Sequence, residues 1–170
     1  MAKEAPDDRY AGLADVSQLA ANTDNSTLDL FDPSAEPDPA QLQDDAAQAE
    51  TAALKNPGIS QVQSASAGYS HRRIHMAASN GFNAGYTRTS RDLSCVAISG
   101  TGTDVERDYD YDSRIFGADL RDASEIGQRA AARAVERAGA TRPKTGAYPV
   151  LFDERIASAL IGHLLQATSG

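Results

Sequence analysis

The 170-residue sequence has no tryptophan, a single cysteine and only 6% aromatic residues. A core must therefore be filled by alanine and small aliphatic side chains. The lone Cys95 excludes an internal disulfide, which fits a reducing, cytoplasmic location. No apolar run approaches the roughly 18 residues that a membrane helix needs, and no secretory leader begins the chain, so we expect no membrane association.

Positive charge is scarce at the front of the chain. Residues 1–56 contain 12 acidic and 3 basic residues, a net charge of −9, whereas residues 57–170 carry +1. Neither part holds a basic run that would follow a phosphate backbone, so we expect no nucleic-acid partner. Residues 1–36 combine high charge with short apolar patches at 13–19 and 28–31. This composition predicts a loosely packed linker whose patches dock on a neighbouring surface.

Three segments have the pattern of helices. Asp38 can cap the first helix, Pro39 suits its first position, and Asn56-Pro57-Gly58 ends it. The second runs from about Asp122 to Ala138. The third follows the cap Asp153, and one apolar face is predicted to point inward: Ile156, Leu160, His163, Leu164 and Ala167.

Residues 59–114 have the alternation of strands instead. Asn80-Gly81 is a strong hairpin signal between HRRIHMAAS and FNAGYTRTS. LSCVAIS is typical of a buried strand, and TDVERDYDYDSR alternates acids with larger side chains. A further short strand, AYPVLF, precedes the third helix.

These elements predict an α+β fold. We expect an antiparallel meander of about four strands packed with two helices, followed by a strand–helix unit that opens a second domain. The corresponding domains are a linker from a missing N-terminal domain (1–36), a central α+β domain (37–145) and the start of a truncated C-terminal domain (146–170).

The acidic strand imitates the ligand spacing of a calcium loop. Asp108, Asp110 and Asp112, together with Asp119, stand at the carboxylate positions. However, Ser113 replaces the glycine of the sharp turn, and no helical pattern precedes the loop. A solvated strand face, which also discourages edge pairing, is the preferred interpretation.

Two histidines and the cysteine are candidates for metal binding or nucleophilic chemistry. His71 and His75 are four residues apart, which would suit one metal ion on a helix. The segment is strand-like and has no glutamate between the histidines, so surface histidines are favoured. Cys95 lies in an apolar strand without a basic neighbour, which predicts a buried, inert thiol.

Five stretches occur in a recognisable order: RYAGLAD, LDLFDP, NGFNAGYTRTSRDLSCVAIS, ERDYDYDSRIFGADL and RPKTGAYPVLFDERIASALIGHLLQATSG. Together they resemble the TldD/PmbA family, the modulator of DNA gyrase family, and in particular its PmbA/TldE-like branch. The family protein is longer, so the resemblance implies a fragment that covers the central domain.

The resemblance has consequences for metal chemistry. The family's active branch carries a His-Glu-x-x-x-His zinc motif on the helix equivalent to residues 156–169, where the glutamate acts as base. Gly162, His163 and Gln166 stand at these positions here. Gly162 offers no ligand, Gln166 is a poor one, and His163 cannot replace the carboxylate. The resemblance therefore implies no catalytic or metal-binding residue in this chain, no cofactor of its own, and zinc in a TldD-like partner.

The implied function is that of a catalytically silent subunit in a TldD/TldE-type zinc metallopeptidase complex that acts on unfolded or precursor peptides. The expected partners are a TldD-like subunit in a heterodimer, or a second copy by self-association, and an extended peptide substrate. Exposed strand edges in 59–114 could hold such a peptide by backbone pairing.

Two alternatives stay open. One is an active zinc peptidase in which His71, His75 and His163 gather as ligands. The other is a stand-alone binding module whose acidic strand face recognises cations or basic partners.

Overall fold

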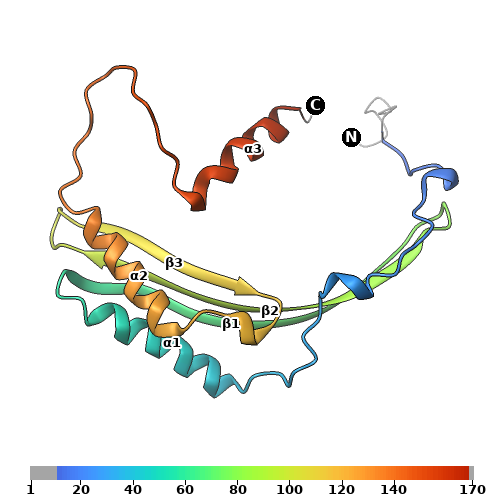
Figure 1. The fold of residues 1–170 in the computed structure, drawn as a ribbon, viewed down its shortest axis with the longest axis horizontal. Helices are drawn as coiled ribbons and strands as arrows, with labels where there is room; N and C mark the ends of the chain where they lie inside the picture. Colours follow the sequence, from blue (N-terminus) through green and yellow to red (C-terminus); the bar gives the residue numbers. More distant parts are fainter. Residues whose placement is uncertain (1–10, 169–170) are drawn as a thin grey trace, which may run out of the picture. The chain divides into compact units, whose positions relative to one another are not determined.

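The computed structural model describes residues 11–168, which form an α+β fold in two compact units that divide after Gly139. Figure 1 shows the order of the elements along the chain. They are α1 (Pro39–Leu54), β1 (Ile59–Ala77), β2 (Asn83–Ser99), β3 (Glu106–Arg114), α2 (Ala123–Glu136) and α3 (Glu154–Thr168), with short 3₁₀ turns at Val16–Gln18, Ser26–Leu28 and Gly117–Asp119.

The sheet is an antiparallel meander in the order β1-β2-β3. β1 pairs with β2 along its whole length, from Ile59 opposite Ser99 to Ala77 opposite Asn83. β3 pairs only with the second half of β2, from Arg91 to Ser99. Asn80-Gly81 lies in the β1–β2 connection as predicted, and Gly81 has a φ of 92°, which glycine adopts without strain.

The sheet has three strands rather than about four. NAGYTRTS and LSCVAIS, which the sequence suggested as parts of separate strands, both lie in β2, and Phe82 precedes it. β1 likewise runs for 19 residues and includes both histidines. The glycine and serine residues within β1 and β2 do not end these strands, because the two strands pair with each other from Ile59–Ser99 to Ala77–Asn83.

The predicted helix caps are confirmed. The carboxylate of Asp38 accepts a hydrogen bond from the amide of Ala40 at 2.7 Å, and that of Asp122 accepts one from the amide of Ser124 at 2.8 Å. Asp153 does the same for Arg155 at 2.9 Å. These bonds satisfy amides that have no partner within a helix.

The strand predicted at AYPVLF is wrong, since residues 147–152 have no regular structure. Its Pro149 cannot donate to a ladder, and no strand pairs with the segment among residues 11–168. The apolar residues of α3 that were expected to point inward are also exposed, Leu160 by 51% and Leu164 by 62%. No helix among the described residues is long and apolar enough to span a membrane.

The core lies between the sheet and the helix pair. α1 contacts β1, α2 contacts β2 and β3, and the two helices contact each other. The buried residues are mostly alanines, as the composition predicted: Ala49 and Ala53 of α1, Ile126, Ala130 and Ala134 of α2, and Leu93, Cys95 and Ala97 of β2. Gly127 allows the closest helix approach, because a Cβ there would lie 2.0 Å from the carbonyl oxygen of Ala49.

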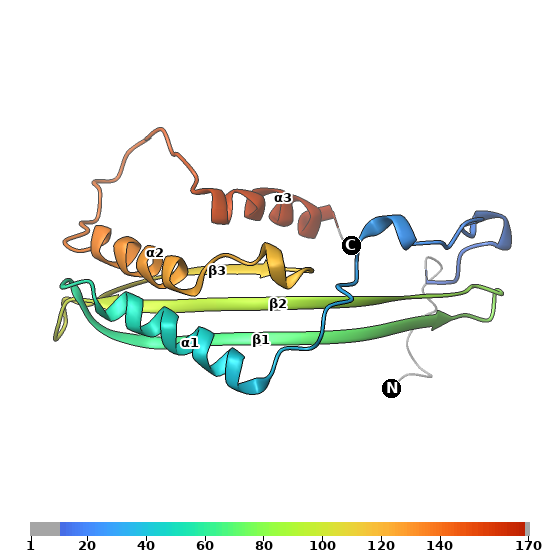
Figure 2. The ribbon, with the colours of Figure 1, turned by 60° about the horizontal axis from the view of Figure 1, so that its bottom comes forward.

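β1 and β2 extend beyond the end of β3 as a two-stranded ribbon, residues 70–90, which we call the hairpin arm (Figures 1 and 2). The preceding segment lies along it. The amide of Thr89 donates to the carbonyl oxygen of Leu30 at 3.1 Å, and the ring of Phe31 lies 5.3 Å from that of His71. The apolar patch at 28–31 therefore docks on this chain's own hairpin.

Candidate functional site

The acidic residues of β3 are buried, not solvated. Asp108, Asp110 and Asp112 are exposed by only 8%, 3% and 7%, whereas Tyr109 and Tyr111 are exposed by 39% and 52%. The predicted orientation of the strand is therefore wrong. The face with the carboxylates points toward α2, and the larger side chains face away from the helices.

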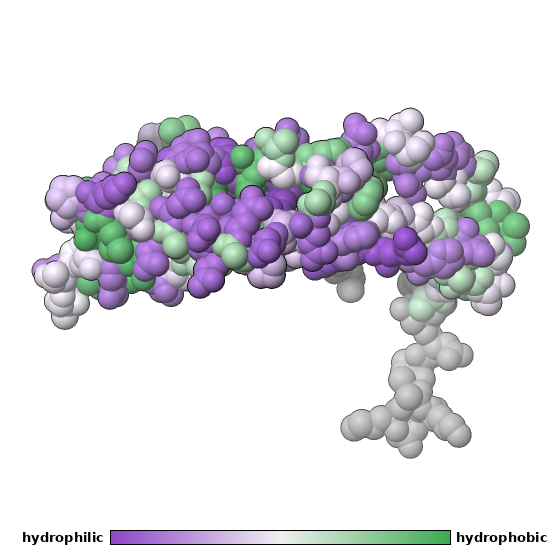
Figure 3. Space-filling model, turned by 90° about the horizontal axis from the view of Figure 1, so that it is seen from below, coloured by the Kyte–Doolittle hydropathy of each residue, from purple (hydrophilic) through white to green (hydrophobic). Residues whose placement is uncertain are grey.

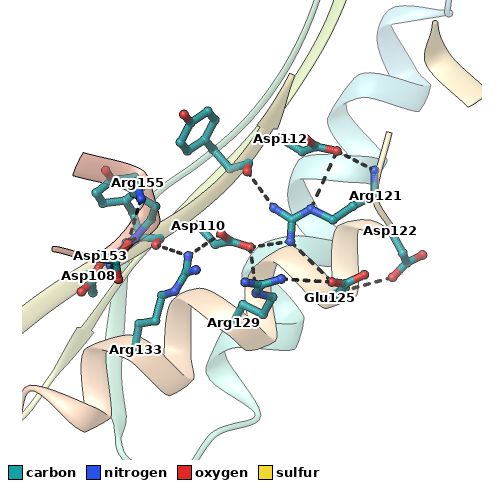
Figure 4. A network of polar contacts seen from close by, with 12 residues as sticks. Asp108, Asp110, Asp112, Arg121, Asp122, Glu125, Arg129, Arg133, Asp153 and Arg155 are labelled. Atoms are coloured by element: carbon teal, nitrogen blue, oxygen red, sulfur yellow. Dashed lines mark hydrogen bonds and ion pairs between the residues drawn. The ribbon is translucent and has the colours of Figure 1, made fainter. Parts of the chain in front are cut away.

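Arginines of α2 and of the segment before it neutralise these carboxylates (Figure 4). Asp110 lies at the centre. Its Oδ2 accepts a hydrogen bond from Nη1 of Arg121 at 2.8 Å, and its Oδ1 is paired with Nη1 of Arg133. Nε of Arg129 lies 3.6 Å from Oδ2 of Asp110. A buried carboxylate requires such partners, because its desolvation is otherwise prohibitive.

Asp112 occupies the next position of the same face. It accepts hydrogen bonds from the amide of Arg121 at 3.0 Å and from Nε of Arg114 at 3.1 Å. Burial opposes its ionisation, but these bonds and the charges of the two arginines outweigh burial and hold the pKa of Asp112 below its usual value. The hydrogen bond to Asp110 raises the pKa of Arg121, so this guanidinium stays charged.

This arrangement leaves no vacancy for a calcium ion. The carboxylate oxygens that would bind Ca²⁺ are paired with guanidinium groups of arginines. In addition, β3 is an extended strand and does not form the loop that such a site needs. The acidic face that was expected to bind cations is thus buried between β3 and α2. Its chemistry is that of an ion-pair network that fixes a helix on a sheet.

His71 and His75 both lie on β1. Residues four apart on a strand are separated by about 13 Å, so the two imidazoles cannot reach one metal ion. Nε2 of His75 is 2.6 Å from Oδ1 of Asn83 across the ribbon, and His71 contacts Phe31. Residues 11–168 contain no group of three or more His, Cys, Asp or Glu side chains placed to hold a metal ion.

Gly162, His163 and Gln166 all lie on α3, in the second unit. Gly162 and Gln166 are one helical turn apart and therefore share a face, as two ligands of a helical zinc motif must. A glycine and an amide provide no pair of imidazole nitrogens, so this donor set does not fit zinc. His163 is exposed.

Cys95 is buried in the core, as predicted. Burial, with a smaller effect from the carboxylates of Glu50 and Asp110, raises the pKa of the thiol to about 11. A thiol that stays protonated at neutral pH is a poor nucleophile and a poor ligand.

The sheet face opposite the helices carries polar groups that the sequence did not single out. Oγ atoms of Ser66 and Ser94 lie 2.9 Å apart across β1 and β2, and Arg107 donates to Gln63 at 3.1 Å. A hollow of about 680 Å³ lies beside Arg107. The outer edge of β1 has no strand partner among the described residues. Alternation predicts such a face, but only the fold shows that no helix of the described residues packs on it.

The described residues form a helix pair on one face of a three-stranded antiparallel meander, with buried ion pairs between β3 and α2. A family model for the PmbA/TldA metallopeptidase central domain matches residues 32–138. The chain belongs to the PmbA/TldD family.

The whole chain aligns with two curated relatives. It is 33% identical to metalloprotease PmbA of Escherichia coli O157:H7 and 30% identical to the metalloprotease PmbA homolog of Haemophilus influenzae. The chain spans 37% of the length of each of these relatives.

Solved structures share the fold. A putative modulator of DNA gyrase from Bacteroides thetaiotaomicron is 24% identical with a TM-score of 0.60, covering 94% of this chain and 38% of that one. TldE from Thermococcus kodakarensis is 18% identical with a TM-score of 0.53, covering 78% of this chain and 29% of that one.

Proposed function

We propose that this chain is part of the PmbA/TldE-like, catalytically silent subunit of a zinc metallopeptidase complex. A TldD-like subunit would carry the zinc and the catalytic groups, and the complex would act on unfolded or precursor peptides in the cytoplasm. The observation that carries the proposal is the pair Gly162 and Gln166 on one face of α3.

The argument from α3 rests on the chemistry of its donors. Zinc in a peptidase needs several protein ligands and a water that a nearby base can deprotonate. Gly162 has no side chain, and an amide such as that of Gln166 binds zinc weakly. His163 stands where the active branch has its base, and it is a far poorer match to that role than a carboxylate.

The proposed domain boundaries fit a non-catalytic, structural role for the central domain. We propose that residues 1–36 are a linker, residues 37–145 the central domain and residues 146–170 the beginning of a further domain. The family match over 32–138 and the unit boundary after Gly139 support the central domain of this proposal. The ion pairs and the alanine core both lie in the first unit, where they stabilise the sheet.

The substrate in this proposal is an extended peptide. The outer edge of β1 presents amides and carbonyls along 19 residues without a strand partner among the described residues. Backbone pairing at such an edge tolerates many sequences, which suits the trimming of unfolded chains.

The peptidase with His71, His75 and His163 as ligands is not favoured, because two of these side chains are too far apart on β1. The stand-alone acidic module is not favoured either, because Asp108, Asp110 and Asp112 are already paired with arginines.

Zinc analysis tests the proposal. The full-length protein, purified alone and together with the His-Glu-x-x-x-His family member from the same organism, is analysed by mass spectrometry for zinc and assayed on unfolded casein. We expect zinc and hydrolysis only with the partner present. Stoichiometric zinc in the protein alone, lost in His163→Ala, would contradict the proposal, as would hydrolysis without the partner.

A further inference from the structure

The segment before α1 lies along the hairpin arm, in the place where a third strand would continue the sheet (Figure 1). Alternate residues of β2 direct their backbone groups to its outer edge, and Arg91 is the last of these that β3 pairs. Two residues closer to the turn, the amide of Thr89 donates to the carbonyl oxygen of Leu30 instead. We call residues 25–34, which take over this edge from β3, the strap.

One threonine and one aspartate hold the strap. Thr89 is 1% exposed, and its Oγ1 accepts a hydrogen bond from the amide of Asp32 at 2.8 Å and donates one to the carbonyl oxygen of Ile115 at 3.1 Å. The carboxylate of Asp32 accepts bonds from the amide of Gly117 at 2.8 Å and from that of Ser34 at 2.9 Å. These bonds, the one from Gly117 above all, lower the pKa of Asp32, so the carboxylate that holds the strap is ionised.

An aromatic side chain and a further backbone bond complete the contact. The ring of Phe31 lies 5.3 Å from that of His71. Nδ2 of Asn25 donates to the carbonyl oxygen of Gly85, another group of the same edge, at 3.0 Å. The strap is therefore bound as a peptide ligand is bound at a strand edge: through backbone groups, an aromatic side chain and the carboxylate that follows it.

The strap does not fill the space beneath it. A hollow of about 490 Å³ lies between the strap and the arm, and Phe31, Arg73 and Thr87 are among the residues that line it. Thr87 directs its backbone groups to the same edge as Thr89, but no backbone group of the strap is bonded to them. Figure 3, viewed from the α1 side, shows hydrophobic residues at the end of the molecule that holds the hairpin turn. A better-fitting chain would gain contacts here that the strap does not make.

The strap also carries backbone strain. Asp29 has a φ of 47°, and it is the one residue other than glycine with a positive φ in the described part of the chain. This left-handed conformation is unfavourable for a residue with a Cβ, although aspartate tolerates it better than most. Release of the strap would recover that cost, which favours a segment that can leave over a permanent strand.

We propose that the site under the strap, formed by His71, Thr89, Gly117 and the adjoining hollow, binds an extended peptide in which an aromatic residue precedes a carboxylate. The strap, with Phe31 before Asp32, stands in for that peptide and excludes it while docked. This inference deepens the proposed function, on which it rests for the substrate class. It adds a second place where the peptide binds and the side chains by which it is recognised.

Other segments of the polypeptide match the site less well. Residues 1–10 contain acids but no aromatic residue directly before one. Leu-Phe-Asp at 151–153 repeats the tripeptide at 30–32, but the carboxylate of Asp153 caps α3 by accepting a bond from the amide of Arg155 at 2.9 Å. Because the curated relatives are longer than this chain, the experiment uses the full-length protein and reports any cover of the site by the rest of the chain.

The test supplies the strap as a separate peptide. A fluorescein-labelled peptide with the sequence of residues 27–35 is titrated against the full-length protein by fluorescence anisotropy. Phe31→Ala with Asp32→Ala should bind the peptide at least about tenfold more tightly than the unaltered protein, because its own strap no longer competes. Leu28→Ala is the matched control, since it truncates an exposed strap side chain outside these contacts; it should bind as weakly as the unaltered protein. A peptide with alanine in place of its phenylalanine and of the aspartate that follows should bind none of them.

Hydrogen exchange locates the peptide. The amides of Thr89 and Gly117 should exchange at least about tenfold faster in the double variant than in the unaltered protein, and slowly again with the peptide bound. Thr89→Val added to the double variant should weaken the peptide, because it removes the hydroxyl that accepts from the strap. Asp32→Asn, which keeps the shape of the side chain and removes its charge, guards against misfolding and should give the same changes to a smaller extent. Unfolded casein should displace the labelled peptide.

Four results would overturn the inference. A peptide that binds the double variant no better than the unaltered protein would show that the strap covers no peptide site. Amides of Thr89 and Gly117 that stay protected in the double variant without peptide would show that another part of the polypeptide covers the edge. A dimer of the unaltered protein that the double variant abolishes, measured by light scattering, would assign the strap to a second copy. Casein that leaves the peptide bound would exclude the substrate class.

These measurements involve neither the partner nor zinc. Their failure therefore leaves the proposed function standing. Conversely, zinc bound to the protein alone, or hydrolysis by it, would contradict the proposed function without changing what the peptide titration shows about the strap.

Discussion

At the scale of residues, the β3–α2 contact works because two spacings match. Alternate residues of a strand are about 6.8 Å apart, and residues four apart on a helix are about 6 Å apart. Arg129 and Arg133 therefore meet Asp110, and Arg137 reaches Asp108 at 3.7 Å. Asp112, the third carboxylate of this face, is paired instead with Arg114 and Arg121, which lie outside α2.

Removal of Asp110 tests this network. Asp110→Ala leaves arginines facing a protein interior without their shared carboxylate, and we expect it to lower the free energy of unfolding by about 3 kcal/mol. Arg129→Ala should cost less than about 1 kcal/mol, because that side chain is 46% exposed and screened by water. Urea unfolding followed by circular dichroism measures both. Equal losses from the two variants would contradict the central role of Asp110.

The lowered pKa of Asp112 predicts a pH dependence. A carboxyl group whose pKa is lower in the folded state stabilises that state above its unfolded pKa of about 3.9, and this contribution disappears as the pH falls through the folded value. Asp112→Asn should therefore destabilise the protein at pH 7, and the difference from the original should shrink below about pH 4. Unfolding curves at several pH values measure this.

The control for that experiment is Asp119→Asn, which removes an exposed carboxylate just after β3. Its effect on the free energy of unfolding should stay within about 0.5 kcal/mol at every pH. A pH-independent loss in Asp112→Asn would show that packing, not charge, makes that residue important.

The orientation of β3 marks the limit of prediction from the sequence at this scale. Strict alternation correctly separates Asp108, Asp110 and Asp112 from Tyr109 and Tyr111, but it does not say which set faces inward. Hydropathy favours tyrosines inside, whereas the fold places them outside. The missed signal is the series Arg129, Arg133 and Arg137 on one helix face, whose repeat matches that of the acids.

At the scale of elements, α1 and α2 approach closely because one helix lacks a side chain at the crossing. Gly127→Ala would place a methyl group on the carbonyl oxygen of Ala49. Alanine stabilises a helix by about 1 kcal/mol relative to glycine, whereas overpacking destabilises a core by about 1–3 kcal/mol. Because the contact here is with rigid backbone, we expect the overpacking loss to be the larger of the two. We expect a lower melting temperature.

Gln128→Ala is the matched control in α2, since Gln128 is exposed and the substitution adds helix propensity without a contact. Thermal unfolding should show this variant at or slightly above the original. A melting temperature for Gly127→Ala at or above that of the original would mean that the helices separate at little cost.

Local chemistry predicted the ends of elements better than their pairing. The capping carboxylates of Asp38, Asp122 and Asp153 act within a few residues, so the sequence alone locates them. β1 and β2 are long because each pairs with the other over its whole length. Residues 147–152 form no strand, and no strand of the described residues pairs with them. Such non-local facts are not contained in periodicity.

At the scale of the molecule, the described chain has its whole core in one unit. The buried cluster belongs to α1, the sheet and α2, whereas α3 has no buried residue among those described. Residues 140–153, which join α2 to α3, are exposed and lack helix and strand. The first unit should therefore unfold as one cooperative body without help from the second.

Limited proteolysis tests this independence. Within residues 140–153, trypsin should cut first after Lys144, because Pro143 protects the bond after Arg142 and Lys144 lies in exposed, irregular chain. The product that contains the sheet should keep the thermal transition of the uncut protein, as followed by circular dichroism. Lys144→Gln should slow the cut without shifting that transition. If cleavage at Lys144 lowers the transition, then α3 stabilises the first unit, and the alanine core is not sufficient for its stability.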